Sequence, residues 1–207
     1  MQKFPMSNIK EFAVFKKLTT PSKIQDFLDA LPVNFEEQGD TCASPLTVLQ
    51  KNKAHCIEGA MVAAAAFWYH GQTPFLMDLK TTPDDFDHVV TLFKEDNHWG
   101  ALSKTNHAVL RYRDPIYRTI RELAMSYFNE YFLDSGKKTL RSYSAPFNLL
   151  EYDNEWLTSD QDLWGISEGL DTVPHFEIIK KDAIKRLRLA HPLEIEAGKL
   201  TEWKRKS

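Results

Sequence analysis

The sequence predicts an α+β fold in which a central helix is buried against an antiparallel sheet. Three observations lead to this expectation. The run from His55 to Gly71 is rich in alanine and apolar nearly all round, which is typical of a buried helix. Strand-like segments follow it and flank a short turn, as in an antiparallel hairpin. Amphipathic helical patterns come before and after these strands, so flanking helices are expected around one sheet.

Two amphipathic helices are predicted in the N-terminal region. Apolar residues recur at helical spacing over Ser7–Leu18, with Ser7 as the expected cap. The same pattern covers Pro21–Leu31, where Pro32 acts as a stop. Small polar residues over Val33–Ser44 then indicate a loop before the central helix.

The strands are predicted directly after the central helix, which Gly71 and Pro74 end. The segment Pro74–Lys80 has the composition of a strand. A hairpin is expected from Asp87–Glu95 and His98–Ser103, because a short polar turn separates two strand-like runs.

The C-terminal half is predicted to contain two further helices. An amphipathic helix is expected over Pro115–Leu133, with proline in its first turn and Gly136 just beyond its end. A further strand is expected over Leu140–Ser144. Irregular structure around short strands is expected over 145–172, and a basic helix over Glu177–Ala190.

The length of 207 residues suits a single domain. We divide residues 1–207 into N-terminal helices over 1–44, a core over 45–145, and an irregular C-terminal region with a helix over 146–207. The formal net charge of −3 gives no attraction to nucleic acid or to an anionic membrane. No apolar run is long enough to span a bilayer, and the N-terminus does not have the pattern of a signal peptide. With only two cysteines, a disulfide framework is not expected, and we predict a cytoplasmic protein.

Cys56 and His88 are the candidate catalytic residues. Cys56 falls in the first turn of the central helix, where unpaired N–H groups and the helix dipole favour the thiolate. The same N–H groups can stabilise an oxyanion. His88 begins a predicted strand, so a ring nitrogen can lie beside a thiol at the helix end and act as its base. Taken alone, Cys56 is better explained as a small buried apolar residue, and His88 is what favours the catalytic interpretation.

Three short motifs carry a resemblance to a known family. They are His55–Ala60 (HCIEGA), Asp87–Val90 (DHVV), and Trp99 after the turn. Together they resemble the transglutaminase-like branch of the papain-like cysteine enzymes, over about a third of the chain. The resemblance implies a papain-like core, a Cys-His-Asp triad, no cofactor, and acyl transfer by amide hydrolysis, deamidation or transamidation.

The third member of the triad departs from the family pattern. Counted from Trp99, the family's acid would fall near Ser103 or Lys104, and neither is a carboxylate. Asn106 can orient an imidazole through its amide oxygen, as asparagine does in the papain branch, so we rank it first and Ser103 second. Asp87 is expected on the opposite face of the strand from His88.

Several other residues have structural explanations that compete with functional ones. Trp99 is expected either to line the substrate cleft or to lie in the core. Glu58 matches the helix dipole, and Cys42 is treated as incidental. In papain-like enzymes a glutamine upstream of the cysteine is an oxyanion donor. This chain has two upstream candidates, Gln38 and Gln50, and their spacing from Cys56 does not decide whether either has this role. No metal is expected, because the candidate zinc ligands lack the paired short spacings of a structural site; they are His55, Cys56, His88, His98 and His107.

These observations predict a cysteine-dependent hydrolase or acyltransferase that acts through a thioester on a protein, a peptide or a small amide. Cys56 attacks the carbonyl, His88 moves the proton, and Asn106 or Ser103 orients His88. The alternative is a domain that kept the scaffold, lost the triad and serves as a binding module. Nucleic acid and membrane are not expected as partners.

Overall fold

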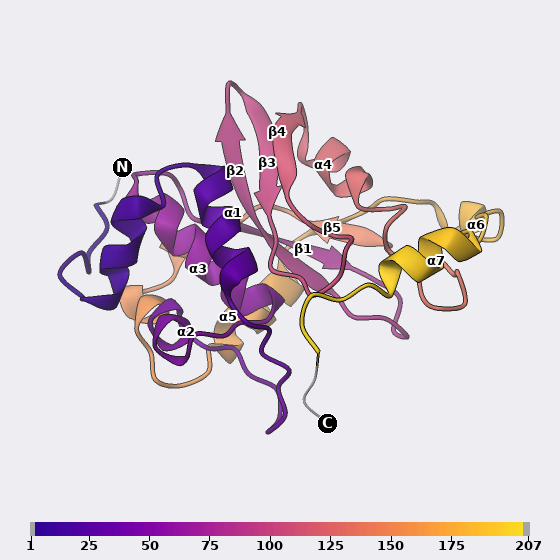
Figure 1. The fold of residues 1–207 in the computed structure, drawn as a ribbon. Helices are drawn as coiled ribbons and strands as arrows, with labels where there is room; N and C mark the ends of the chain where they lie inside the picture. Colours follow the sequence, from indigo (N-terminus) through magenta and orange to yellow (C-terminus); the bar gives the residue numbers. More distant parts are fainter. Residues whose placement is uncertain (1–2, 205–207) are drawn as a thin grey trace.

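The computed structural model describes residues 3–204, so the ends of the predicted domain, 1–2 and 205–207, lie outside the description. Within this range a seven-stranded sheet has the order β4-β3-β2-β1-β5-β7, with β6 also beside β1, and every pairing is antiparallel (Figure 1). The predicted α+β class is confirmed at this level. The strands are β1 (Phe75–Lys80), β2 (His88–Glu95), β3 (His98–Leu102), β4 (Arg113–Tyr117), β5 (Ser142–Ser144), β6 (Phe147–Asn148) and β7 (His175–Glu177).

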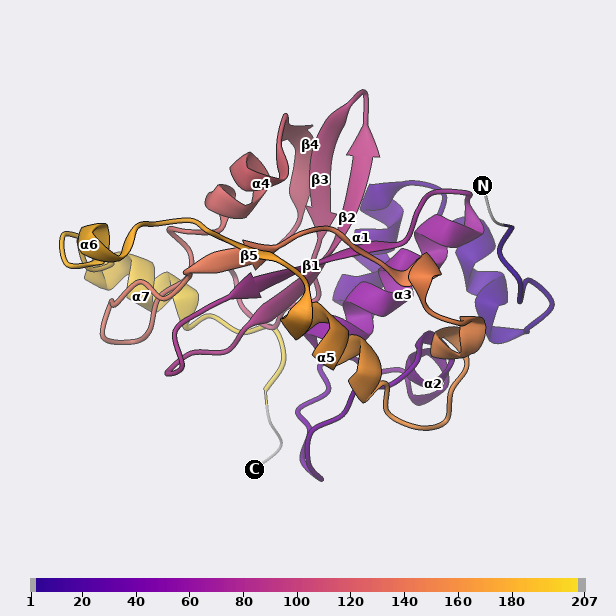
Figure 2. The ribbon, with the colours of Figure 1, turned by 180° about the vertical axis from the view of Figure 1, so that it is seen from behind.

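Helices lie on both faces of the sheet. On one face α3 packs with the N-terminal helices, and α5 lies beside α3 when the molecule is seen from behind (Figure 2). On the other face α4 covers a second, smaller core. No helix in residues 3–204 has the length and apolar character needed to cross a membrane. The helices are α1 (Pro21–Ala30), α2 (Pro45–Lys51), α3 (Cys56–Tyr69), α4 (Ile120–Ser126), α5 (Trp164–Thr172), α6 (Lys181–Ile184) and α7 (Pro192–Gly198), with 3₁₀ turns at Glu11–Lys17, Leu149–Glu151 and Asn154–Leu157.

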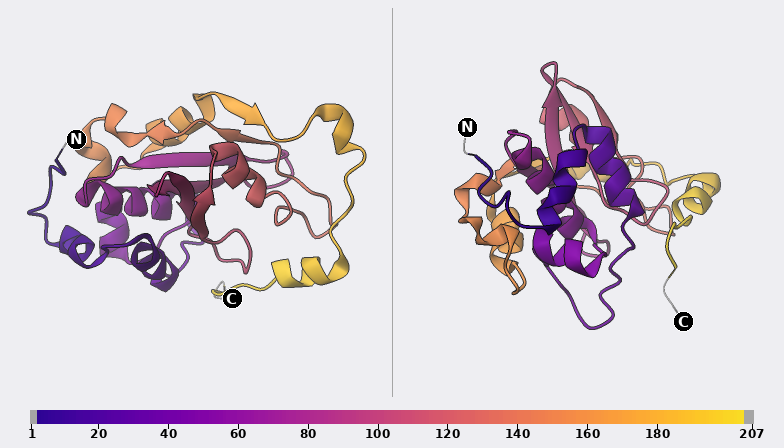
Figure 3. Two further views of the ribbon diagram at one scale, coloured as in Figure 1. Left: turned by 90° about the horizontal axis from the view of Figure 1, so that it is seen from above. Right: turned by 60° about the vertical axis from the view of Figure 1, so that its left-hand side comes forward.

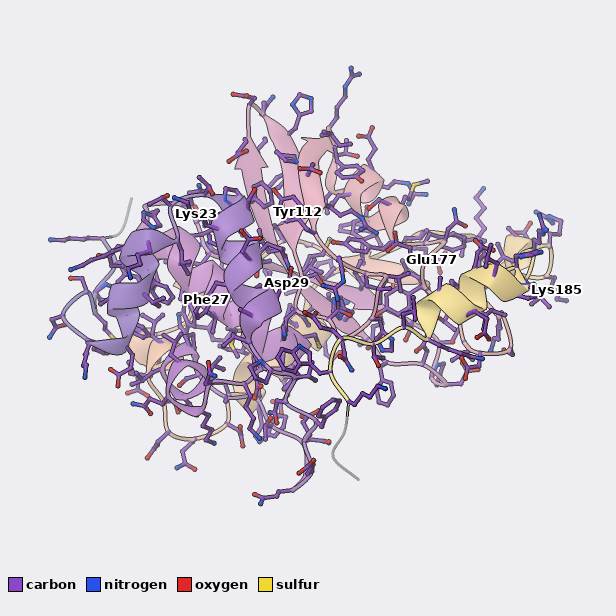
Figure 4. All side chains as sticks on the ribbon, in the orientation of Figure 1. Lys23, Phe27, Asp29, Tyr112, Glu177 and Lys185 are labelled. Carbon is purple, nitrogen blue, oxygen red and sulfur yellow. The ribbon has the colours of Figure 1, made fainter. Side chains whose placement is uncertain are left out.

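The C-terminal helices form an arm beyond the sheet. Figure 3 shows α6 and α7 projecting from the main body before the chain turns back, and in Figure 4 Lys185 marks this arm while Phe27 marks the N-terminal helices at the opposite side. The returning segment pairs with the loop after β3, where the Ala108 N–H donates to Leu200 O at 3.0 Å and the Glu202 N–H donates to Asn106 O at 2.9 Å. This pairing attaches the arm to a loop that lies beside the sheet end.

The central helix α3 is buried almost completely. Its alanines and its large side chains Phe67 and Trp68 are all 2% exposed or less. Phe67 stacks on Phe93 of β2, and Thr91 of the same strand donates a hydrogen bond to Ala60 O at 2.6 Å. The small side chains allow a close approach to the sheet, which is the arrangement that the apolar surface of the run predicted.

The β2–β3 hairpin is also as predicted. Asp96 and Asn97 both have positive φ, 45° and 66°, as the two central residues of a type I′ turn require. The register pairs Thr91 with Leu102, and both face α3. Side chains alternate between the two faces along a strand. His88 is three residues before Thr91, and Ser103 is one residue after Leu102. Both therefore lie on the face away from α3, at the open end of the hairpin.

Four predicted elements are wrong in type or extent. Over Ser7–Leu18 the chain forms only a 3₁₀ helix over Glu11–Lys17, without a side-chain cap, and Phe12 and Phe15 of this helix pack side by side in the core. In place of a helix over Pro115–Leu133, Arg113–Tyr117 forms the edge strand β4, where proline is tolerated, and α4 starts only after Thr119 caps it.

The C-terminal expectations fail for a similar reason. Over Glu177–Ala190 the chain pairs first as β7 and then forms only the short helix α6. Within 145–172, which was expected to be irregular, α5 forms because Ile166 and Leu170 lie against the core. The helices α2 and α7, both with proline in the first turn, were not predicted. Strand pairing decides β7 and core contacts decide α5, and neither can be read from the local periodicity of the sequence.

We expect Gly59→Ala to lower the free energy of unfolding by about 1–3 kcal/mol, because an added Cβ would lie 2.4 Å from Lys104 Cβ. Urea denaturation measures this change. The matched control is Gly165→Ala in α5, where no atom lies within 4 Å, and it should leave stability unchanged or raise it. Equal stability of the two variants would contradict the close contact between α3 and the residues after β3.

Candidate active site

Cys56 is the first residue of α3 and is partly exposed. It lines a cavity of about 250 Å³ together with His55 and His88. The cavity lies at the open end of the β2–β3 hairpin, since His88 is the first residue of β2. Its other walls include Val33, Asp85, Phe86, Asp87, Lys104, Thr105, Asn106, His107, Leu110 and Tyr131.

The His88 ring connects the thiol to Ser103. Ser103 Oγ lies 2.7 Å from His88 Nε2 and donates its own proton to Leu110 O at 2.6 Å. Because a hydroxyl has one proton, Ser103 must accept a hydrogen bond from His88 Nε2–H. Nδ1 is then the ring nitrogen left for the hydrogen bond between His88 and the Cys56 thiol. This is the tautomer in which Nδ1 can take a proton from the thiol.

A second imidazole, His55, lies on the other side of the thiol. Its Nε2 is 2.9 Å from Thr41 O, and a carbonyl can only accept, so Nε2 carries a proton. Its Nδ1 is 3.9 Å from Cys56 Sγ. Burial lowers the pKa of His55, but the hydrogen bond to Cys56 and the charges of Cys56, Glu58 and Glu36 outweigh it and raise the pKa to about 9.

The two cysteines have opposite electrostatic environments. Burial raises the pKa of the Cys56 thiol, but hydrogen bonds and charge from His55 and His88 outweigh burial and hold the pKa well below its usual range. Burial, with the charges of Glu58 and Asp162, raises the pKa of Cys42 to about 12. Cys56 is therefore the thiol that ionises more readily, while the burial of Cys42 favours its neutral form.

Glu58 fixes the loop that carries Thr41. It is 1% exposed, and its carboxylate accepts hydrogen bonds from Thr41 Oγ1 at 2.8 Å, the Ala43 N–H at 3.1 Å and the His55 N–H at 3.0 Å. Asn34 Nδ2 donates to the same carboxylate at 3.2 Å. A buried carboxylate needs such donors, so Glu58 holds the loop against the start of α3 and thereby positions His55.

Gln25 of α1 positions Ser103. Its Oε1 accepts from the Ser103 N–H at 3.0 Å, and its Nε2 donates to Ser103 O at 2.9 Å. The same Nε2 donates to Asp29, which Figure 4 labels on α1. The side chain is 6% exposed and continues the backbone pairing of the sheet beyond β3. Sequence reasoning missed Gln25 and the role of His55, because both depend on contacts between distant segments.

Of the predicted site residues, Trp99 lies away from the cavity and the others lie at or beside it. Cys56, His88 and Ser103 form one connected chain of contacts. Asn106 lines the cavity, but its amide exchanges hydrogen bonds with the backbone of Trp203 at 3.0 and 2.7 Å, so Ser103 takes the position at His88 Nε2. Trp99 is not a wall of this cavity: it lies near the turn end of β3, under Lys94 Nζ, a strand length away.

The remaining candidates have structural contacts. Asp87 accepts from the Thr81 N–H at 2.7 Å and does not orient His88. Gln50 donates to Glu11, and neither Gln38 nor Gln50 lines the cavity. Within residues 3–204 the group with metal-like spacing is Asp78, Asp87 and Asp171, which includes none of the histidines considered for zinc. The Lys80 ammonium contacts Asp87 and Asp171 and supplies a cation there.

No protein-family model matches the chain, and no curated protein matches it in sequence.

We expect iodoacetamide to alkylate Cys56 below neutral pH, because a lowered thiol pKa leaves thiolate present there. Cys42 is the internal control and should stay unmodified. His88→Ala should move the alkylation curve to higher pH, since a hydrogen bond and a charge that favour the thiolate are lost. Peptide mass spectrometry across a pH series measures all three rates. Coincident curves for parent and variant, rising only near pH 8 to 9, would contradict the thiolate assignment.

Proposed function

We propose that this chain is a cysteine-dependent hydrolase or acyltransferase with a transglutaminase-like core of the papain-like type. One observation carries the proposal: a thiol at a helix N-terminus is hydrogen-bonded to an imidazole whose far nitrogen is held by Ser103, inside an open cavity. Nucleophile, base and orienting group are thus connected in the order that acyl transfer needs.

The order of elements supports the family resemblance. Cys56 begins α3, His88 begins β2, and Ser103 directly follows β3. The antiparallel hairpin brings the start of β2 and the end of β3 together, so residues 15 apart meet at one sheet end. This is the order of Cys, His and orienting residue that the sequence motifs indicate, with serine in place of the family's acid.

The proposed reaction has two halves. The Cys56 thiolate attacks the acyl carbon, and the electron pair of the C=O bond moves onto its oxygen. Collapse of this intermediate expels the amine, which takes the proton from His88, and leaves a thioester. Water or a second amine then gives a proton to His88 and attacks the thioester, so the acyl product leaves and the thiolate is restored. No cofactor is needed for these steps.

The cavity favours an acyl donor with an apolar flank. Phe86 lines the cavity with His88, and its side chain is 89% exposed. Two hydrogen bonds fix its backbone: the Phe86 N–H donates to the Asp85 carboxylate at 2.8 Å, and Tyr131 Oη donates to the Phe86 carbonyl at 3.1 Å. Val33 and Leu110 add apolar walls. We propose a peptide, protein or small amide as substrate. Both cysteines are free thiols, which fits the proposed cytoplasmic location.

One observation favours the rival function, a binding module without turnover. Ser103 is neutral, so it orients His88 without the charge that a carboxylate would place beside the imidazolium formed during the reaction. The two functions differ in whether acylation of Cys56 is followed by release of the acyl group.

We expect the parent protein to turn over p-nitrophenyl acetate, an activated acyl donor, releasing many equivalents of p-nitrophenol per chain. Cys56→Ser should lower turnover by roughly 10³-fold or more, because a hydroxyl is a poor nucleophile beside histidine. Cys42→Ser is the control and should retain turnover. Absorbance of the released phenol measures the rate, and circular dichroism checks the fold. If one equivalent of p-nitrophenol or less is released per chain, with no further turnover, the result would overturn the proposed enzymatic function and support the binding module.

A further inference from the structure

The direction of the Ser103 hydroxyl decides which nitrogen of His88 carries the proton. Ser103 accepts from His88 Nε2–H because its own proton goes to Leu110 O, at 2.6 Å. If that carbonyl moves away, the hydroxyl is free to turn and donate to Nε2, and Nδ1 then carries the ring proton. The ring loses the nitrogen that takes the proton from Cys56. The position of the Leu110 carbonyl therefore matters for the chemistry of the thiol.

Leu110 has a backbone conformation that a bulky residue rarely adopts. Its φ is 62°, in the left-handed region, and such a conformation persists where neighbouring contacts fix it. Two hydrogen bonds act on this peptide backbone. The Leu110 carbonyl accepts from Ser103 Oγ, and the Leu110 N–H donates to Glu130 Oε2 at 2.8 Å. The Glu130 carboxylate is thus the contact that holds Leu110 from the side away from Ser103.

Glu130 is itself held by Arg113, the first residue of β4. Arg113 Nη2 donates to Glu130 Oε2 at 2.6 Å, and the guanidinium lies 4.1 Å from the ring centre of Tyr127. Arg113 Nε also donates to Ser126 Oγ at 2.9 Å. Since β4 pairs with β3, the strand that leads to Ser103, the carboxylate is fixed from the same sheet that carries the candidate base.

We propose that Glu130 is a positioning residue for His88. It holds the Leu110 carbonyl where that carbonyl takes the Ser103 proton, and so keeps Ser103 as the acceptor for His88 Nε2–H. This inference rests on the proposed acyl-transfer function, in which Nδ1 of His88 accepts the proton. Glu130 does not line the cavity that contains Cys56, and it exchanges no proton in the reaction.

An accepting Ser103 favours the thiolate as well as the tautomer. A His88 ring that is protonated on both nitrogens only donates, so it is stabilised by a hydroxyl that accepts and not by one that donates. The protonated ring in turn stabilises the thiolate beside it, since a hydrogen bond and charge from His88 lower the Cys56 pKa. Loss of the Glu130 contact should therefore affect both thiol alkylation and ester turnover.

We expect Glu130→Met to move the curve of Cys56 alkylation against pH upward by about 0.5–1 pH unit, the effect of one hydrogen bond. It should also lower kcat for p-nitrophenyl acetate about tenfold or more, because the base is misplaced. Iodoacetamide labelling and phenol release measure the two effects, and circular dichroism checks the fold. The fold should survive, because the Glu130 side chain is 34% exposed. If it does not, Glu130→Ala is judged by the same results.

A second variant separates the hydrogen bond from the charge. Glu130→Gln keeps an oxygen that accepts from the Leu110 N–H and loses only the negative charge. Charged groups already lie around Glu130, because Asp85, Asp134 and Lys199 line the cavity beside it. If position rather than charge matters, Glu130→Gln should stay close to the parent in both the alkylation curve and kcat.

Two controls show whether the effect passes through Ser103. In a Ser103→Ala background the hydroxyl is absent, so adding Glu130→Met should move the alkylation curve no further. Glu122→Met removes a carboxylate that likewise accepts a backbone N–H, from Arg118 at 2.7 Å, but lies away from the cavity. This variant should keep the parent curve and the parent kcat.

A folded Glu130→Met protein with the parent curve and kcat would overturn the inference. Equal shifts for Glu130→Met and Glu130→Gln would also overturn it, because charge alone would then explain the effect. The same added shift with and without the Ser103 hydroxyl would assign the effect to another route, with the same consequence. A parent without ester turnover overturns the proposed function alone, since the alkylation curves still decide whether Glu130 positions the ring.

Discussion

The Cys56 thiol lies between two imidazole rings, and much of the surrounding structure fixes those rings. Each ring has its Nε2 proton committed to an acceptor: Thr41 O for His55, and Ser103 Oγ for His88. Ser103 in turn donates to Leu110 O, so a backbone carbonyl ends both hydrogen-bond chains. A carbonyl cannot donate, so Nε2 carries a proton in both rings, and Nδ1 is the nitrogen left to contact the thiol. The low pKa of Cys56 follows from these fixed orientations.

The fold supplies rigid supports for both sides of this arrangement. On the His55 side, the buried carboxylate of Glu58 ties the loop with Thr41 to the start of α3. On the His88 side, Gln25 of α1 holds both backbone groups of Ser103. At Gly59, α3 packs closely on Lys104, which lies two residues after β3, and this contact helps to set the distance between the two sides. Residues far from the thiol therefore control its chemistry through position rather than contact.

The sequence predicts the parts of this structure that are local. The alanine-rich run, the hairpin with its two-residue turn, and the pairing of a helix-start cysteine with a strand-start histidine all follow from short patterns. The asparagine of the papain branch favours Asn106 over Ser103 beside His88, but the segment that returns after α7 engages the Asn106 amide through the Trp203 backbone. Gln25, Thr41 and the role of His55 depend on packing between segments tens of residues apart, and no local pattern contains that information.

The central claim is that Cys56 is a thiolate at neutral pH, and the ultraviolet absorbance of the thiolate tests it directly. A pH titration of the parent, from which the curve of Cys56→Ser is subtracted, gives the ionisation of this one thiol. We expect the difference to show that this thiolate forms at a clearly lower pH than that of an ordinary cysteine, because the two imidazoles outweigh the effect of burial. A difference curve that is flat at pH 7 and rises only near pH 8 to 9, as for an ordinary cysteine, would contradict the account.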